Sequence, residues 1–534
     1  MPDHTQRSRP PRSRNGQPQA GQHGKPRTGQ PQAGQPRTGQ PRTGQPRTGQ
    51  PRTGQPRTGR PRTDAPRRAA YDVLRAVADR DAYANLLLPA LLKERGLTGR
   101  DAAFATELTY GTLRGRGTYD AILAACSDRD EIDPPVRDVL RLGVHQLLAT
   151  RVGHHAAVAT SVDLAKDVCG PRPSGFVNAV LRRVATRDLD AWVQIVAPDR
   201  SRDPSGYLAV RHSYPRWIVD AFRDALGTAS AETEDALAAG NVRPEVVLAL
   251  TPPQLAGSAQ LVGSAQLAGS AQLAGLPLNG ERTRWSPYGF RLAGGDPAPL
   301  VASGQAAVQD EASQLAALAL TRVGLNPVNP VDPLEGRDQL WLDLCAGPGG
   351  KARLLSGLAA ARGARLVASD IRPHRARRVL EALRRAGGED QGVLAADGRQ
   401  LPWSPGTFDR VLADVPCSGL GSLRRRPDAR WRKTAADVAE LTGLQRELLN
   451  AAIDSVRPGG VVAYVTCSPH LAETRDVVTA VTQSRDDVTI LDAPAVLPEV
   501  PGLRVPDPRH PRFAQFWPHR HGTDAIFLAL LRRG

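Results

Sequence analysis

The chain has 534 residues, 40% of them hydrophobic, so it is long enough for about two to four domains with their own cores. It holds no apolar stretch of membrane-spanning length and no apolar core of a signal peptide, which argues against a membrane-embedded or secreted protein. Five cysteines without C-x-x-C spacing indicate reduced thiols in a cytoplasmic protein and argue against a zinc site.

The net charge of +16 is concentrated at the N-terminus. Residues 1–63 carry thirteen Lys and Arg against one acid, Asp3, and so hold twelve of the sixteen net positive charges. Their Gln-Pro-Arg-Thr-Gly repeat is too rich in Pro and Gly to build a core, and we expect a disordered basic tail. Such a tail attracts phosphates without regard to sequence, and a tail with no specific partner is an equally good interpretation.

Three further regions follow the tail. Apolar spacings of three and four predict a helical domain over residues 64–195. Residues 196–305 are mixed, and we expect a small α+β connecting domain there. Within it, a Gln-Leu-Ala-Gly-Ser-Ala repeat over 254–275 matches neither helix nor strand and predicts an expanded surface loop.

Residues 306–534 alternate apolar runs with helical patterns. The expected helices are 374–386 and 437–456, and the expected buried strands are Gln339–Leu344, Arg365–Ser369, Gly392–Ala395, Arg410–Ala413 and Val461–Thr466. This alternation predicts an α/β domain with a doubly wound, mostly parallel sheet covered on both faces, as in Rossmann-like folds.

A glycine-rich turn joins the first of these strands to a helix, the place where such sheets bind cofactors. Its G-x-G-G spacing, at Gly347, Gly349 and Gly350, is neither a dinucleotide fingerprint nor a phosphate loop. Asp370 ends the next strand and suits ribose hydroxyls, while Asp397 follows the third strand and suits an adenine amine. An adenosyl ligand without a diphosphate fits this set, and S-adenosylmethionine fits better than a dinucleotide.

Two cysteines follow later strands, in Asp414-Val415-Pro416-Cys417-Ser418 and Thr466-Cys467-Ser468. A thiolate that adds to C6 of cytosine activates C5 toward a methyl group, and the adduct needs an acid near N3, for which Asp414 is placed. Cys417 is a competing attacker, because DNA cytosine methyltransferases use a Pro-Cys thiol. Buried, inert thiols are the alternative for both, and we adopt it for Cys126, Cys169 and Cys345.

The chain resembles the Sun family of RNA cytosine-5 methyltransferases over about residues 65–534, without the 254–275 repeat. The matching motifs are residues 308–313, 343–351, Asp370 with His374-Arg375, Asp397-Gly398, 414–419, 421–428 with Trp431, 466–468 with Glu473, and 521–524. Residues 67–184 are similar to the NusB-like RNA-binding domain that precedes the catalytic domain in this family.

The resemblance implies a role for each site residue. Cys467 is the expected nucleophile, Cys417 assists release of the adduct, and Asp414 binds the base. The expected S-adenosylmethionine site consists of Asp370, Arg375, Asp397, Asp414 and the turn residues Cys345, Ala346, Gly347, Pro348, Gly349, Gly350 and Lys351. Arg424, Arg425 and Trp431 are expected near a splayed-out RNA base.

The resemblance also implies a substrate, 16S ribosomal RNA or a small-subunit precursor, methylated by a cytoplasmic monomer without metal or membrane. A transfer-RNA methyltransferase of the same family is the enzymatic alternative, and preference for ribosomal RNA rests on analogy with the front domain. A non-catalytic RNA-binding assembly or antitermination factor is the alternative from another class. The intact cysteines and aspartates argue against that last alternative.

Overall fold

The computed structural model describes residues 63–252, 279–324, 338–388 and 391–534. The predicted N-terminal tail up to residue 62 and the 254–275 repeat lie outside the described residues. No described helix is both long enough and apolar enough to cross a membrane.

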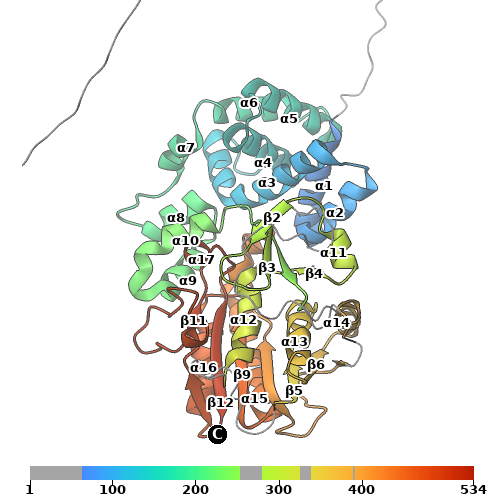
Figure 1. The fold of residues 1–534 in the computed structure, drawn as a ribbon. Coiled ribbons are helices and arrows are strands. Elements are labelled where there is room, and N and C mark those ends of the chain that lie inside the picture. The colour runs from blue at the N-terminus through green and yellow to red at the C-terminus, as the bar shows by residue number, and fades with distance from the viewer. Residues whose placement is uncertain (1–62, 253–278, 325–337, 389–390) are drawn as a thin grey trace, which may run out of the picture. The chain divides into compact units, whose positions relative to one another are not determined.

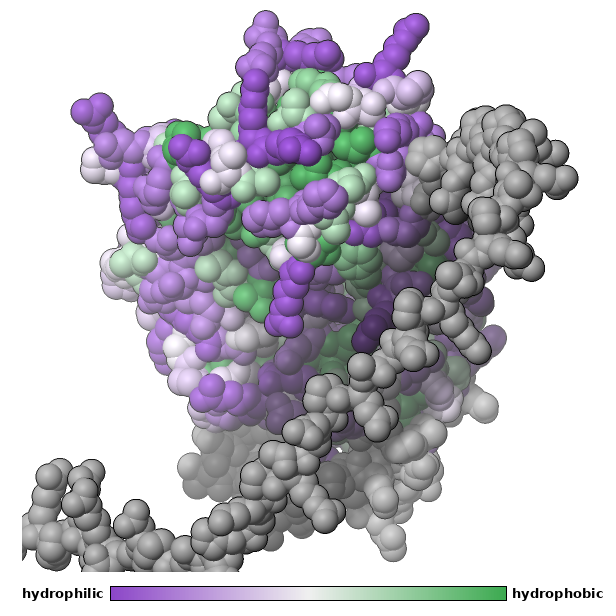
Figure 2. All heavy atoms as spheres, turned by 90° about the horizontal axis from the view of Figure 1, so that it is seen from above, coloured by the Kyte–Doolittle hydropathy of each residue, from purple (hydrophilic) through white to green (hydrophobic). Residues whose placement is uncertain are grey.

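The first described region is helical, as the sequence predicts (Figure 1). Its helices are α1 (Ala65–Asp79), α2 (Ala84–Glu94), α3 (Gly99–Cys126), α4 (Pro134–Ala149), α5 (His154–Cys169), α6 (Ser174–Val184) and α7 (Leu189–Val196). The Asp64 carboxylate accepts the Arg67 N–H at 3.0 Å and starts α1, and Val73, Leu74 and Val77 then lie on its buried side. Seen from above in Figure 2, hydrophilic side chains project around hydrophobic ones on this end of the molecule.

A connecting region of short helices and a small sheet follows. Its helical elements are α8 (Pro204–His212), α9 (Arg216–Leu226), η1 (Gly227–Glu232), α10 (Thr233–Ala239) and α11 (Ala298–Ala302). Its strands β1 (Val246–Leu250), β2 (Asn279–Arg282), β3 (Gly289–Gly294) and β4 (Ala306–Val308) pair antiparallel in the order β2-β3-β1-β4. The α+β character expected for this region is therefore confirmed.

The C-terminal region is built on a larger sheet. Its strands run β10-β12-β9-β8-β5-β6-β7, and β11 pairs with β12. They are β5 (Leu340–Asp343), β6 (Arg365–Asp370), β7 (Gly392–Ala395), β8 (Phe408–Asp414), β9 (Val456–Thr466), β10 (Val488–Leu491), β11 (Ala514–Gln515) and β12 (Phe527–Arg533). The pairs from β7 to β9 are parallel, and β12 and β10 add an antiparallel edge. The doubly wound prediction is confirmed, and the antiparallel edge was not predicted.

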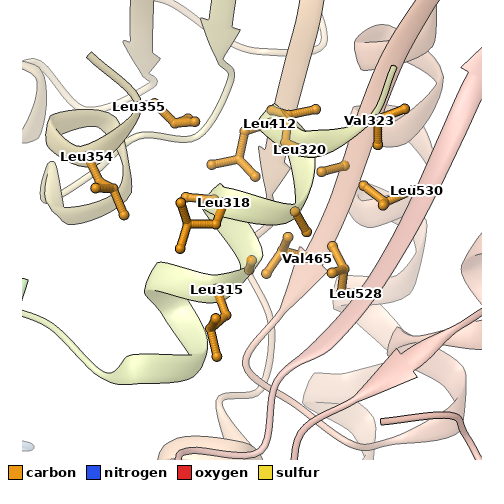
Figure 3. Packing of buried hydrophobic residues seen from close by; sticks show 14 of the residues in the cluster. Leu315, Leu318, Leu320, Val323, Leu354, Leu355, Leu412, Val465, Leu528 and Leu530 are labelled. Carbon is orange, nitrogen blue, oxygen red and sulfur yellow. The ribbon is translucent and has the colours of Figure 1, made fainter. Parts of the chain in front are cut away.

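Helices cover both faces of this sheet. They are α12 (Glu311–Arg322), α13 (Gly350–Ala360), α14 (Pro373–Arg385), α15 (Ala435–Ser455) and α16 (Arg475–Gln483). The same region also holds the short helix α17 (Pro518–His521), which contacts α10, and the single turns η2 (Leu420–Ser422), η3 (Pro427–Trp431), η4 (Leu471–Glu473) and η5 (Pro494–Val496). Alternate strand residues feed two cores: Leu412 and Val465 pack with α12 and α13, whereas Val411 and Tyr464 pack with α15 and α16. Figure 3 shows Leu320 of α12 near Leu412, Val323 just after this helix near Leu530, and Leu528 near Val465.

We expect Leu320→Ala to lower the free energy of unfolding by about 3 kcal/mol, because it leaves a cavity in the core under α12. Leu320 is fully buried. Leu86→Ala is the matched control: this side chain is 66% exposed, and its loss should change stability by less than about 0.5 kcal/mol. Denaturant unfolding of both variants measures the two effects. Equal losses would contradict the assigned packing.

Candidate active site

The carboxyl ends of the parallel strands bring the predicted residues to one edge of the sheet. Asp343 ends β5, Asp370 ends β6 and Asp414 ends β8. In the register, Asp343 lies beside Leu412 of β8, and Asp414 lies beside Val465 of β9. Parallel strands end at the same edge, which is where open α/β sheets bind ligands. Residues that are far apart in the chain therefore share one site.

The glycine-rich turn is fixed against the end of β6. The Ala346 N–H donates to the Ser369 carbonyl at 2.8 Å, and the Ser369 hydroxyl donates to the Leu344 carbonyl at 2.7 Å. Gly349 has a φ of 108°, which an L side chain rarely adopts, and α13 begins directly after it. At Gly347 a Cβ would collide with the Asp370 carboxylate. The turn thus requires glycine at both positions, and it approaches Asp370 closely.

An acidic cluster surrounds one partly buried lysine beside this turn. The Lys351 Nζ donates to Asp414 Oδ2 at 2.8 Å. Burial lowers the pKa of Lys351, but the ion pair with Asp414 outweighs it and keeps the pKa above its ordinary value. Burial, followed by the charge of Asp414, raises the pKa of Asp343 to about 8. Among the described residues, both Asp343 oxygens are buried without a hydrogen-bond partner.

These residues fit S-adenosylmethionine. The glycine turn brings the backbone close to Asp370, which offers a carboxylate at the sheet edge. The carboxylates of Asp370 and Asp414 lie at this edge beside Lys351, and they suit a ligand that carries a sulfonium and an ammonium group. No described group of three or more His, Cys, Asp or Glu side chains is arranged to hold a metal ion.

The other predicted cofactor residues lie in different surroundings. Asp370 accepts the Arg372 N–H at 2.8 Å, and Arg375 is exposed with its side chain near Gly347. Asp397 accepts two hydrogen bonds from the Arg399 guanidinium, at 3.0 and 2.7 Å, and this contact lowers the pKa of Asp397.

Cys345 shares the turn with the predicted cofactor residues, but its thiol is not activated. Burial, reinforced by neighbouring carboxylates such as Asp343, raises the pKa of Cys345 well above its ordinary value. A thiol held in its neutral form is a poor nucleophile, which agrees with our interpretation of Cys345 as inert.

The two candidate thiols meet at the site. Cys417 Sγ lies 3.3 Å from Cys467 Sγ, and both cysteines are free. The hydrogen bond with Cys417 lowers the pKa of Cys467 below its ordinary value, although burial opposes this shift. The same hydrogen bond, together with burial, raises the pKa of Cys417 well above its ordinary value. Cys467 therefore ionises first and Cys417 donates to it, an arrangement that suits Cys467 as nucleophile.

Three residues expected near RNA make contacts within the protein instead. Arg424 and Arg425 each donate to Asp310 Oδ2 at 2.7 Å, and both also pair with Asp524. The Trp431 ring lies against the guanidinium of Arg116 in α3, 5.5 Å from the ring centroid. The two arginines are thus part of an internal ion-pair cluster with Asp310 and Asp524. Contact of this segment with RNA stays a prediction.

Sequence reasoning missed the polar groups that hold the Cys417 segment. Glu473 was recognised only as part of a motif, and Ser418 and Gln445 were assigned no role. In the structure the Ser418 N–H donates to Glu473 at 2.7 Å, and the Gln445 side chain donates to Glu473 at 3.2 Å. The one signal in the sequence was Glu473 itself, an acidic residue six positions after Cys467. Gln445 gave no signal, because it lies in the middle of a helical pattern.

The comparisons with known proteins agree with this architecture. Residues 331–532 match the family model described as 16S rRNA methyltransferase RsmB/F, and residues 64–186 match the NusB family. A protein of Mycobacterium tuberculosis named only as a methyltransferase, Rv1407, is 51% identical over 87% of this chain and 96% of its own length. The ribosomal RNA small subunit methyltransferase B of Pseudomonas syringae is 32% identical over 87% of this chain and 96% of its own length.

A crystal structure described as that of PH0851 shares the fold, with a TM-score of 0.67 at 21% identity over 88% of this chain and 98% of that one. Fold and site together define a methyltransferase that uses S-adenosylmethionine. The chain belongs to the RsmB/F family of RNA methyltransferases and carries a NusB-family region in front of the catalytic region.

We expect Cys417→Ala to raise the pKa of the Cys467 thiol, because the variant removes the hydrogen bond that stabilises the thiolate. The rate of Cys467 alkylation, followed against pH by peptide mass spectrometry, should shift to higher pH. Cys169→Ala serves as the control, since Cys169 lies in α5. An unchanged profile for Cys467 in the Cys417→Ala variant would contradict the assigned donor.

We expect Asp310→Asn to cost about 3 kcal/mol of the free energy of unfolding, because it leaves two poorly exposed guanidinium groups with one carboxylate. The control is Asp190→Asn. This variant breaks the ion pair of Asp190 with Arg211, and the Asp190 side chain is 77% exposed. That loss should stay below about 1 kcal/mol. Thermal or denaturant unfolding compares the two, and a negligible cost at Asp310 would refute the structural role of the cluster.

Proposed function

We propose that this enzyme methylates C5 of a cytosine in 16S ribosomal RNA through a covalent adduct between Cys467 and C6 of the base. The observation that carries the proposal is the pair of thiols beside Asp414 and the glycine-rich turn. Their sulfur atoms lie 3.3 Å apart, and their pKa values are shifted in opposite directions. Nucleophilic catalysis at C6 needs one ionised and one protonated group, and this pair supplies both.

In this proposal the Cys467 thiolate forms a bond to C6, which places electron density on C5. Asp414 binds the base at N3 or its amino group and stabilises the adduct, while Lys351 holds the Asp414 carboxylate at 2.8 Å. S-adenosylmethionine, when bound, supplies the electrophilic methyl group that C5 accepts. Loss of the C5 proton to a base then allows elimination of Cys467, and Cys417 gives its proton to assist release of the thiolate.

The cofactor site in this proposal consists of Asp370, Arg375, Asp397, Asp414 and residues Cys345, Ala346, Gly347, Pro348, Gly349, Gly350 and Lys351. The glycine turn excludes side-chain bulk, and the carboxylates accept hydrogen bonds from the ligand. Asp397 needs to rotate away from Arg399, or to share its carboxylate, before it can accept from an adenine amine.

The proposed substrate rests on the relatives. The Pseudomonas syringae protein is named for the small-subunit ribosomal RNA, and the NusB-family region offers a helical RNA-binding module. We further propose that the chain divides into a basic tail (1–63), a helical RNA-binding domain (64–195), a connecting domain (196–305) and a catalytic domain (306–534). In this proposal the enzyme is a cytoplasmic monomer that acts on the RNA before the small ribosomal subunit is fully assembled.

We expect Cys467→Ala to abolish methyl transfer from labelled S-adenosylmethionine to unmodified 16S ribosomal RNA while the variant still binds the cofactor. The attacking thiol is missing, whereas the glycine turn is untouched. Filter-bound label and equilibrium cofactor binding give the two readouts, with Cys126→Ala in the helical region as control. Normal turnover by Cys467→Ala would refute the nucleophile. Transfer by the wild type to transfer RNA alone would refute the substrate.

We expect Cys417→Ala to form the adduct with RNA but to release it slowly, because the proton donor for elimination is lost. A denaturing gel should then show a protein–RNA band that persists with time. Wild-type protein and Cys169→Ala should show little of it. Release by Cys417→Ala at the wild-type rate, with no retained band, would remove Cys417 from the mechanism.

A further inference from the structure

One buried carboxylate, from the chain segment that follows Cys467, holds the segment around Cys417. Glu473 is fully buried in η4, six residues after Cys467. Its Oε1 accepts the Ser418 N–H at 2.7 Å, and its Oε2 accepts the Ser418 hydroxyl at 2.5 Å. The residue that follows Cys417 is therefore bound through both its backbone and its side chain.

The other flank of Cys417 is fixed to the same carboxylate. The Gln445 side chain, which is buried in α15, donates to the Pro416 carbonyl at 2.9 Å and to Glu473 at 3.2 Å. The Tyr464 hydroxyl donates to the Glu473 carbonyl at 2.8 Å and fixes the backbone that carries the carboxylate. Pro416 and Ser418 are thus both tied to one group, and Cys417 lies between them.

The donors that reach this carboxylate are neutral, so its negative charge acts inside the site. The two oxygens of a carboxylate can accept all three of these donors, whereas the single oxygen of a glutamine side chain cannot. The charged groups that act on the two thiols are Asp414 in β8, Lys351 in α13, Arg426 before η3 and Glu473 in η4.

These charges treat the two thiols differently. Glu473 is among the groups that raise the pKa of Cys417, after the hydrogen bond to Cys467, burial and the charge of Cys467. The charges that act on Cys467 are Asp414, Lys351 and Arg426, and two of these three lower its pKa. The carboxylate thus biases ionisation away from Cys417 and toward Cys467.

We propose that Glu473 is a positioning residue that holds Cys417 against Cys467 and keeps Cys417 protonated, so that the two thiols have separate tasks. This inference rests on the proposed function for its catalytic consequence. Glu473 acts through Ser418 and through its charge. It takes no part in bond making.

The test is the pH dependence of alkylation of each cysteine by iodoacetamide in the full-length protein, read by peptide mass spectrometry. In Glu473→Gln the Cys417 profile should shift to lower pH, because the variant removes a negative charge that disfavours the thiolate. Glu311→Gln is the matched control: Glu311 is also buried and accepts two backbone N–H groups, at 2.6 and 2.7 Å, from Trp285 and Ser286. In this control variant the alkylation profile of Cys417 should equal that of the wild type.

Ser418→Ala separates the charge from general loosening of the loop. It removes one hydrogen bond but keeps the carboxylate, so Cys417 should ionise at a pH no lower than in wild type. A loosened loop would shift Cys417 the same way in both variants. The proposal is overturned if Cys417 in Glu473→Gln titrates as in wild type, or if Ser418→Ala lowers its pKa equally.

Methylation of 16S ribosomal RNA gives the catalytic readout. For Glu473→Gln we expect kcat to fall about tenfold, as for loss of one hydrogen bond to a charged group. The KM for S-adenosylmethionine should stay unchanged, and the covalent protein–RNA adduct should persist. Wild-type kcat in this variant would also overturn the proposal. If the wild type itself transfers no methyl group, the proposed function fails, while the alkylation profiles still decide the role of Glu473.

Discussion

The parallel pairing of β8 with β9 is the constraint on which the site depends. Asp414 lies beside Val465 in the register, and the Val415 N–H donates to the Val465 carbonyl at 3.1 Å beyond the end of β8. The chain on each side then turns away within three residues and leaves a cysteine at the edge. Because adjacent strands are held by their backbone hydrogen bonds, the separation of the thiols follows from the sheet itself.

Electrostatics give this geometry its chemical direction. Two identical thiols at 3.3 Å would compete for one proton, and their surroundings decide which of them loses it. The charge of Lys351 lowers the pKa of Cys467, and the buried Glu473 holds Ser418, the residue after Cys417. The carboxylates of Asp370 and Asp414 beside the glycine turn serve a different purpose, since they suit a cationic methyl donor.

The expectation of a buried strand at Gly392–Ala395 was wrong, because β7 is the last strand of the sheet and most of its residues are exposed. Much of the rest was predictable from the sequence, because β5, β6, β8 and β9 contain apolar runs that end in polar residues. Such runs indicate buried parallel strands, and their ends mark the ligand edge. The placement of β12 between β9 and β10 was not predictable, since it depends on pairing between distant segments. The ion cluster of Arg424 with Asp310 and Asp524 was missed for the same reason: its members come from three separate parts of the chain. Glu473 was recognised in the sequence as part of a motif, but its contact with Ser418 depends on the folded structure and could not be predicted.

The central claim is that Cys467, and not Cys417, bonds to the base. The most direct measurement is to trap the enzyme on 16S ribosomal RNA that contains 5-fluorocytidine, where fluorine blocks the elimination step, and to identify the modified peptide by mass spectrometry. We expect a nucleotide attached to the peptide that contains Cys467. Attachment to the peptide that contains Cys417 would contradict it.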